Sequence, residues 1–190
     1  MKKELIHLKN ISNVLTLEKV AKKDGRNLLP EDLSVIKNCS IICSKNEILY
    51  VGKDRNKINS FSESIVEEVD LEEFSVTPEI VDSHTHLVFG GDRSDEYAMR
   101  LNGSSYQEIA KSGGGISSTS SATNKLTKDE LISSSVKKIN EMINYGVGTI
   151  EIKSGYGLNY EKEYEISLII NHLKNIFAPK VKIINTFMAA

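Results

Sequence analysis

The residues whose types and spacing best suit chemistry are His84 and His86, two histidines separated by one residue. They end a short run, Glu79–Ser83, that has the composition of a β-strand. Alternate residues of a strand point to the same face, so the two imidazoles would lie side by side. Imidazole nitrogens are common ligands of divalent metal ions. The spacing therefore predicts half of a metal site; the alternative is two polar residues that simply end a strand.

The segments that must position these histidines alternate between strand and helix patterns. We expect strands at 79–84, 147–152 and 181–187, and helices at 105–111, from Thr127 to Gly146 and from Asn159 to about Lys174. Thr127 and Glu130 have the spacing of a capping box, in which each side chain satisfies a free backbone N–H. Strands alternating with helices are typical of a parallel sheet. Polar residues at strand ends (His84, His86, Lys153) are typical of the active-site face of a (β/α)₈ barrel.

The first part of the chain, 1–77, has a different pattern and is predicted to be a small antiparallel β-sandwich domain. Its β-rich segments are short and are broken by Gly, Asn, Asp and Lys. We expect them at 5–8, 14–17, 39–43, 47–52 and 65–71. The second domain, 78–190, is then the start of an α/β barrel. Because a full (β/α)₈ barrel usually needs about 250 residues, we expect only the first third of one, in a truncated chain.

Length, charge and cysteine content exclude several other classes of protein. The chain has 190 residues and a formal net charge of −2, so no polybasic surface indicates a nucleic-acid or membrane partner. No apolar run approaches the roughly 20 residues that span a bilayer, and the N-terminus lacks the apolar core of a signal peptide. We therefore expect a cytoplasmic protein. The two cysteines, Cys39 and Cys43, are predicted to be small core residues rather than a disulfide.

Several motifs together point to one family. The chain contains Val81-Asp82-Ser83-His84-Thr85-His86-Leu87-Val88-Phe89-Gly90-Gly91-Asp92-Arg93, a later triple glycine within 105–116, and Lys-Ser-Gly-Tyr-Gly within 151–158. These stretches resemble the amidohydrolase superfamily generally and the imidazolonepropionase family more narrowly. The final residues, 186–190, are similar to that family's Thr-Phe-Leu-Gly-Ala stretch, with two conservative changes. The resemblance covers the whole chain, weakly to Thr77 and strongly beyond it.

The resemblance implies a metal-dependent hydrolase of histidine degradation. A single zinc or iron ion would have His84 and His86 as its first two ligands and would lower the pKa of a bound water. Attack on the ring carbonyl of 4-imidazolone-5-propanoate and cleavage of a C–N bond would give N-formimidoyl-L-glutamate. The family match also implies that Arg93 binds the substrate's propionate, for which a guanidinium fork is suited, and that Tyr156 binds substrate between two glycines. A full-length protein of this family is expected to be a homodimer.

The same resemblance places part of the site outside this chain. The family's other metal ligands, a histidine and an aspartate, and its proton-transferring glutamate are expected beyond residue 190, so no catalytic residue is assigned here. Catalytic zinc sites generally use three protein ligands, so we expect the 190 residues alone to bind metal weakly and to be inactive.

Two alternatives remain open. One is another amidohydrolase, such as an aminohydrolase acting on a purine or an s-triazine; such a neutral substrate would need no carboxylate clamp from Arg93. The other is a truncated fragment with no catalytic role. Among the remaining residues, Lys153 is expected to be an ordinary amine, and Tyr106 to assist Arg93 or to pack in the core. We expect His7 and His172 to be structural.

Overall fold

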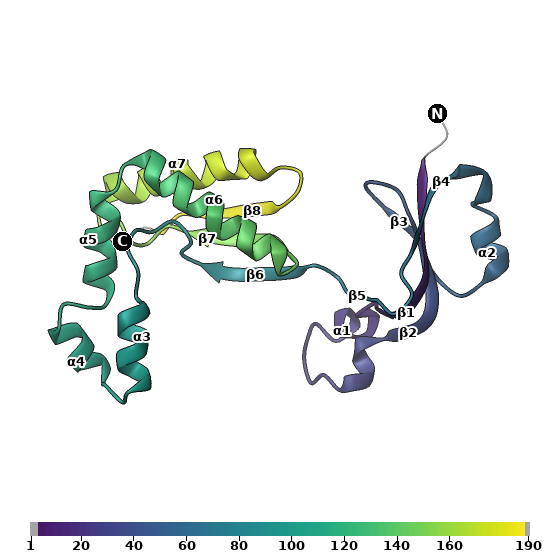
Figure 1. Cartoon of the computed structure of the whole chain (residues 1–190), viewed down its shortest axis with the longest axis horizontal. Helices are drawn as coiled ribbons and strands as arrows, with labels where there is room; N and C mark the ends of the chain where they lie inside the picture. The colour runs from purple at the N-terminus through teal and green to yellow at the C-terminus, as the bar shows by residue number, and fades with distance from the viewer. Residues whose placement is uncertain (1–3, 189–190) are drawn as a thin grey trace. The chain divides into compact units, whose positions relative to one another are not determined.

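The computed structural model of the chain describes residues 4–188, so Ala189 and Ala190 of the C-terminal motif and residues 1–3 lie outside the described residues. The chain divides into two compact units, Met1–Pro78 and Glu79–Ala190. Figure 1 shows both units, the first coloured purple to blue and the second teal to yellow. No helix within residues 4–188 is long and apolar enough to cross a membrane.

The first unit contains one five-stranded sheet with the order β3-β2-β1-β4, in which the short β5 also pairs with β1. The strands are β1 (Leu5–Leu15), β2 (Val35–Cys43), β3 (Ile48–Gly52), β4 (Ile65–Asp70) and β5 (Ser75–Val76). The connections contain α1 (Glu18–Lys22), α2 (Arg55–Asn59) and two 3₁₀ turns, η1 (Pro30–Leu33) and η2 (Ser62–Ser64). A sandwich needs a second sheet, and residues 4–78 form one sheet only.

The prediction of a purely antiparallel sheet is wrong. β1 pairs antiparallel with β2, but it pairs parallel with both β4 and β5. Parallel neighbours need a long crossover connection, and here β2, β3 and α2 together form that connection from β1 to β4. The sheet is therefore mixed.

The two strands expected at 5–8 and 14–17 are one strand, β1. Its register against β2 shifts between Leu8 and Ile11, and Asn10 in this interval has a φ of 59°. A β-bulge of this kind inserts an extra residue without ending the strand, and Asn tolerates the left-handed conformation better than most residues do. Polar Asn10 looks like a strand end in the sequence but is a bulge in the structure.

The core of the first unit lies around Ile11, Val14, Cys39 and Ile41, all of which are buried. Cys39 is a buried free thiol, as expected, and burial raises its pKa. His7 is also buried, and its Nδ1 lies 3.2 Å from Oε1 of Glu68 on β4, consistent with a structural role.

The second unit contains a parallel sheet of three strands in the order β6-β7-β8. The strands are β6 (Ile80–Thr85), β7 (Val147–Lys153) and β8 (Lys182–Thr186). The helices are α3 (Ser94–Leu101), α4 (Tyr106–Lys111), α5 (Ile116–Lys125), α6 (Lys128–Asn144) and α7 (Tyr160–Phe177). Figure 1 shows α6 and α7 on the same face of this sheet.

The ends of the two long helices agree with the capping residues in the sequence. The Thr127 hydroxyl accepts a hydrogen bond from the Glu130 N–H at 3.3 Å, while the Glu130 carboxylate accepts one from the Thr127 N–H at 2.8 Å. Asn159 caps α7 by accepting from the Lys162 N–H at 2.9 Å. Both helix starts are therefore confirmed.

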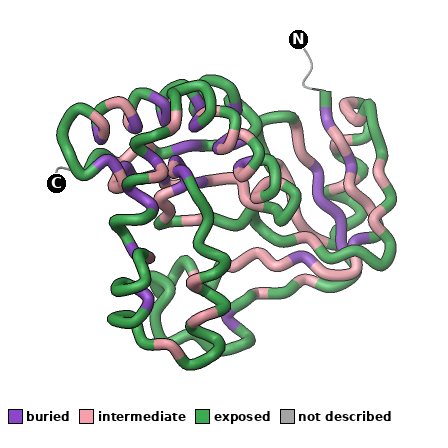
Figure 2. Tube along the Cα trace, turned by 60° about the vertical axis from the view of Figure 1, so that its left-hand side comes forward, coloured by how far each residue is buried: buried purple, intermediate pink, exposed green. Residues whose placement is uncertain are grey.

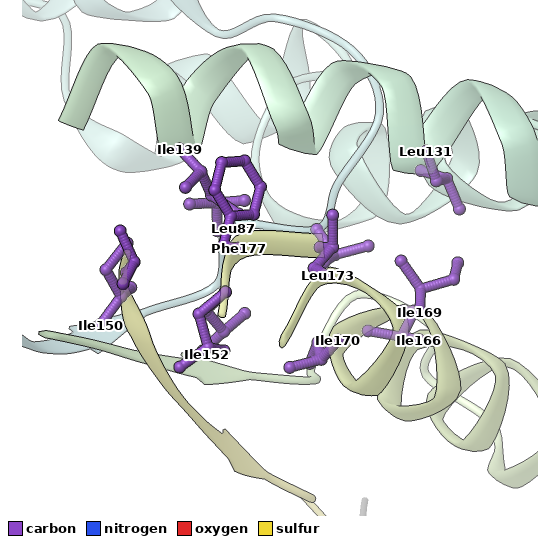
Figure 3. Close-up of a cluster of buried hydrophobic side chains, with 13 residues drawn as sticks. Leu87, Leu131, Ile139, Ile150, Ile152, Ile166, Ile169, Ile170, Leu173 and Phe177 are labelled. Atoms are coloured by element: carbon purple, nitrogen blue, oxygen red, sulfur yellow. The ribbon is translucent and has the colours of Figure 1, made fainter. Parts of the chain in front are cut away.

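The core of the second unit fills the space between the sheet and these helices (Figure 3). Ile150 and Ile152 of β7 point to the helices and are fully buried, as are Ile169 and Ile170 of α7. Figure 2 shows buried stretches in both units, alternating along the chain with intermediate and exposed ones. Burying each such side chain contributes roughly 1.5–3 kcal/mol, so this layer holds β7 firmly in place. The alternate residues of β7, Glu151 and Lys153, are thereby directed to the opposite face.

Two helices of the second unit, α3 and α5, were not expected. The sequence of α5, Ile-Ser-Ser-Thr-Ser-Ser-Ala-Thr-Asn-Lys, lacks an apolar stripe, which is the main helix signal. Its buried face consists of small hydroxyl residues instead. The Thr123 hydroxyl donates to the Thr119 carbonyl at 2.7 Å and accepts from the Gly90 N–H at 3.0 Å. These bonds tie α5 to the loop that follows the histidine pair.

Candidate functional site

The two histidines lie together at the end of β6. Their ring centroids are 5.6 Å apart, with an angle of 70° between the planes. His84 is exposed and His86 is half-buried. The buried Nδ1 of His86 has no hydrogen-bond partner among residues 4–188. An unpartnered ring nitrogen beside a second imidazole suits metal coordination, because buried polar atoms are normally satisfied.

Gly155, just after β7, allows the His86 ring to occupy this position. A Cβ at residue 155 would lie 2.6 Å from both Nδ1 and Cε1 of His86. Real Cβ atoms do not approach other heavy atoms so closely, so a side chain here would displace the imidazole. Gly155, the first glycine of the Lys-Ser-Gly-Tyr-Gly motif, therefore leaves the space that the His86 ring occupies.

Tyr156 packs against the same imidazole. Its ring centroid lies 5.6 Å from that of His86 in an edge-on arrangement, and 5.9 Å from that of Phe89. Such edge-to-face contacts are favourable for aromatic rings. The structure thus brings together three of the four predicted site residues: His84, His86 and Tyr156.

Phe89, in the loop after β6, is itself held by a lysine of α6. The Lys138 ammonium lies 3.4 Å from the Phe89 ring centroid. It also donates to the carbonyls of Leu87 and Phe89, at 3.4 and 3.3 Å. Burial lowers the pKa of Lys138. This lysine fixes the backbone immediately after His86, and the sequence alone did not identify it.

Arg93 lies in the loop before α3 and is bound by a carboxylate of that helix. Its Nε and Nη2 donate to one oxygen of Glu96, Oε2, at 2.9 and 2.5 Å. These hydrogen bonds raise the pKa of Arg93, to which the nearby phenols of Tyr156 and Tyr106 also contribute. The hydrogen-bond partner of Arg93 is therefore Glu96. Tyr106 is 63% exposed, so it does not pack in the core.

Glu96 connects Arg93 to the glycine-rich loop. Its second oxygen, Oε1, accepts from the Gly115 N–H at 2.9 Å. The hydrogen bonds from Arg93 and Gly115 lower the pKa of Glu96. A small hollow of about 260 Å³ lies beside this pair, lined by Arg93, Glu96, Tyr97 and Arg100. The triple glycine is therefore anchored at its end rather than free.

A second polar group lies on the face of β7 opposite the helices. The Lys153 ammonium donates to Oε1 of Glu151 at 2.6 Å, and the Thr186 hydroxyl donates to the same oxygen at 2.7 Å. These two bonds lower the pKa of Glu151. Lys153 is thus paired with a carboxylate of its own strand. The alternation of Ile and charged residues in β7 is the sequence signal that could have identified Glu151.

The described residues do not form a complete metal site. Within residues 4–188, no cluster of three or more His, Cys, Asp or Glu side chains could hold an ion. A larger hollow, of about 580 Å³, lies in the first unit, and its lining, which includes Asn10, Lys53, Arg55 and Glu72, contains none of the predicted site residues. His172 lies exposed on α7.

Comparison with solved structures places this fold in a known class. The chain is similar to A. niger ochratoxinase, with a TM-score of 0.58, 10% identity, and coverage of 97% of this chain and 31% of that one. It is also similar to a triazine hydrolase variant, with a TM-score of 0.52, 13% identity, and coverage of 95% and 46%. The chain has the fold of the amidohydrolase class.

Sequence relatives narrow the class to a family. The imidazolonepropionase of Bdellovibrio bacteriovorus is 38% identical over 186 residues, which are 97% of this chain and 43% of the relative. That of Clostridium tetani is 38% identical over 190 residues, 100% of this chain and 44% of the relative, and that of Acinetobacter baumannii is 44% identical over 158 residues, 83% and 38%. No protein-family model matches the chain. The chain is thus similar over nearly all of its length to curated imidazolonepropionases, and it spans about two fifths of the length of these relatives.

Proposed function

We propose that this chain is part of a metal-dependent hydrolase that opens the ring of 4-imidazolone-5-propanoate to give N-formimidoyl-L-glutamate. The observation that carries the proposal is the 5.6 Å contact between His86 and Tyr156, because it joins the histidine pair to the expected substrate-binding residue. The names of the sequence relatives support the reaction. Since the chain covers about two fifths of those relatives, we assign the activity to a protein of their full length.

On this proposal the second unit is the first third of a (β/α)₈ barrel, and the first unit is the N-terminal part of a β-sandwich domain. The parallel order β6-β7-β8, with helices on one face, supports the barrel. The histidine pair, Gly155 and Tyr156 all lie at or just beyond the carboxyl ends of β6 and β7, the edge where barrel enzymes carry their sites. The single sheet of the first unit would be one of the two sandwich layers.

The residues present fit part of a zinc or iron site. His84 and His86 would hold the ion, and the unpartnered Nδ1 of His86 supports a ligand role for that ring. Such an ion supplies Lewis acidity and a coordinated water of lowered pKa. Two imidazoles are one short of the three protein ligands usual for catalytic zinc, so the remaining ligands would lie outside the described residues.

Arg93 and Tyr156 would bind the substrate. A guanidinium has five N–H donors, and Glu96 engages one on Nε and one on Nη2, which leaves donors for the substrate's propionate. Two arginines and one carboxylate, Arg93, Arg100 and Glu96, line the adjacent hollow, so its charged side chains have a net positive charge that favours an anion. The Tyr156 phenol can donate a hydrogen bond to a ligand placed beside His86.

The experiment joins this chain in frame to the part of the Clostridium tetani relative that it does not cover. With zinc or iron added, we expect loss of the ultraviolet absorbance of 4-imidazolone-5-propanoate, whereas the 190-residue chain shows none. Arg93→Lys in the fusion should raise KM for this substrate, because a point charge replaces the bidentate fork.

A fusion that is folded and metal-loaded but does not consume the substrate would contradict the proposal. Turnover of a purine or an s-triazine by that same fusion would instead support a different aminohydrolase. Circular dichroism and metal analysis of each preparation distinguish these outcomes from simple misfolding.

A further inference from the structure

Glu163 is a deeply buried carboxylate that none of the roles above uses. It lies near the start of α7 and is 1% exposed. Its Oε1 accepts hydrogen bonds from two consecutive backbone amides, those of Gly157 at 2.7 Å and Leu158 at 3.0 Å. Its Oε2 is buried without a hydrogen-bond partner among residues 4–188. Burying a carboxylate is costly unless hydrogen bonds compensate, and here the two backbone amides supply that compensation.

What Glu163 holds is the turn that follows Tyr156. The backbone amides of Gly157 and Leu158 both donate to Oε1 of Glu163, and two hydrogen bonds to one oxygen fix the backbone of both residues. The other side of Gly157 is held as well, because its carbonyl accepts a hydrogen bond from the side-chain amide Nδ2 of Asn159 at 3.2 Å. Leu158 has a φ of 54°, a left-handed conformation that a non-glycine residue keeps only when its surroundings impose it.

Gly157 also sits directly on the helix backbone. A Cβ at residue 157 would lie 2.7 Å from the Glu163 nitrogen and 2.9 Å from the Lys162 carbonyl carbon. Both atoms belong to the helix backbone and cannot move aside as a side chain could. The backbone of Gly157 therefore packs directly against the first turn of α7, with no room for a side chain between them. Tyr156 immediately precedes Gly157, and the centroid of its ring lies 5.6 Å from that of His86.

We propose that Glu163 is a positioning residue that fixes the 155–158 turn and thereby sets the Tyr156 ring against His86. For substrate binding by Tyr156 the inference rests on the proposed function. The placement of the ring does not, since it is a property of the chain alone. The feature that matters is the position of the acceptor oxygen, not the charge of the carboxylate.

The test compares Glu163→Gln, which keeps an acceptor oxygen at the same reach, with Glu163→Asp, which keeps the charge but shortens the side chain. The readout is the ring resonances of His86 in a chain labelled at histidine, which contains only four histidines. Tyr156→Leu supplies the spectrum of His86 without the neighbouring aromatic ring. A second readout is hydrogen exchange at the Gly157 and Leu158 amides.

We expect Glu163→Asp to move the His86 resonances toward those of Tyr156→Leu and to speed exchange at both amides by at least tenfold. Glu163→Gln should retain the parent His86 spectrum, which is the rescue that a general loss of folding would not give. The matched controls are Glu161→Asp and Glu161→Gln, at an exposed carboxylate in the same helical turn, which should change neither readout.

Parent-like His86 resonances in Glu163→Asp would overturn the inference, as would equal disruption by Glu163→Asp and Glu163→Gln. Because neither readout needs substrate or metal, a fusion without turnover would count against the proposed function and leave this result intact. Conversely, turnover with an unmoved His86 spectrum would overturn the positioning role alone.

Discussion

Glu96 binds Arg93 and the backbone of Gly115 with different oxygens of one carboxylate. Oε2 accepts from the guanidinium, and Oε1 accepts from the Gly115 N–H at 2.9 Å. The Arg93 side chain is 39% exposed, whereas that of Glu96 is 14% exposed. The more buried partner is thus the carboxylate, which links the loop before α3 to the start of α5. The orientation of the proposed substrate-binding arginine therefore depends on Glu96.

This relationship predicts a pH-dependent contribution of Glu96 to stability. Its pKa is lowered in the folded chain from an ordinary value of 4.5, chiefly by the hydrogen bond from Arg93. A group with a lowered folded pKa stabilises fully above its unfolded pKa, and that stability is lost as pH falls through the folded value. We expect Glu96→Gln to lower the free energy of unfolding modestly at pH 7, because it weakens the hydrogen bonds from Arg93 and Gly115 and the Arg93 partner is partly exposed.

The measurement is urea unfolding of both proteins between pH 7 and pH 3. The difference in free energy of unfolding between the two proteins should persist from pH 7 down to about pH 4.5. Below that pH it should shrink as Glu96 becomes protonated. Asp95→Asn, an exposed carboxylate of the same helix, controls for removal of one negative charge. A difference that grows toward pH 3 would contradict the assigned direction of the pKa shift.

Gly155→Ala is expected to displace the His86 imidazole. The new methyl would lie 2.6 Å from two ring atoms, and overpacking of this kind typically costs about 1–3 kcal/mol. The His86 ring resonances should shift, and the free energy of unfolding should fall by that amount. Gly113→Ala is the matched control, because Gly113 also has a positive φ but has no atom within 4 Å of its Cβ position. Equal effects of the two substitutions would mean that backbone strain, not the His86 contact, is responsible.

The sequence predicted the second unit better than the first. Strands and helices with strong apolar periodicity or caps, such as β7 and α7, were located correctly to within a few residues. The helix α5 was missed because hydroxyl residues, bonded to backbone carbonyls, replace its apolar stripe. The parallel pairing of β1 with β4 was missed because pairing direction depends on the path of residues 35–64, which local composition does not encode.

For the candidate site, local spacing identified the histidines and the motif tyrosine, but not the residues that hold them. His84 and His86 follow from the period of a strand, and Tyr156 came from the family motif. Glu96, Lys138 and Glu163 act through contacts with backbone groups distant in the sequence or across a turn. Such contacts are visible only once the chain is folded, since a charged residue on a helix is most often solvent-exposed.

Ile152→Ala tests whether the layer between β7 and the helices supports the site. Ile152 is fully buried, and truncating such a side chain costs about 2–5 kcal/mol, through lost transfer free energy and the cavity left behind. Ile184→Ala on β8 is the control, because Ile184 is 44% exposed and should cost below about 1 kcal/mol. Urea unfolding measures the free energy of unfolding of both variants. Similar losses in Ile152→Ala and Ile184→Ala would show that the buried layer contributes less to stability than its packing indicates.

Metal binding by the chain itself distinguishes an incomplete ligand set from a complete one. Two imidazoles alone hold zinc weakly, so zinc retained after dialysis should be well below one ion per chain. In calorimetric titration, His84→Ala or His86→Ala should weaken the remaining affinity at least tenfold, about 1.4 kcal/mol, whereas His172→Ala on the exposed side of α7 should not. Tight stoichiometric zinc in the 190-residue chain would contradict the two-ligand description and require a further ligand among its own residues. Equal weakening by His172→Ala would place the bound ion elsewhere, because His172 is not at the β6 end where the pair lies.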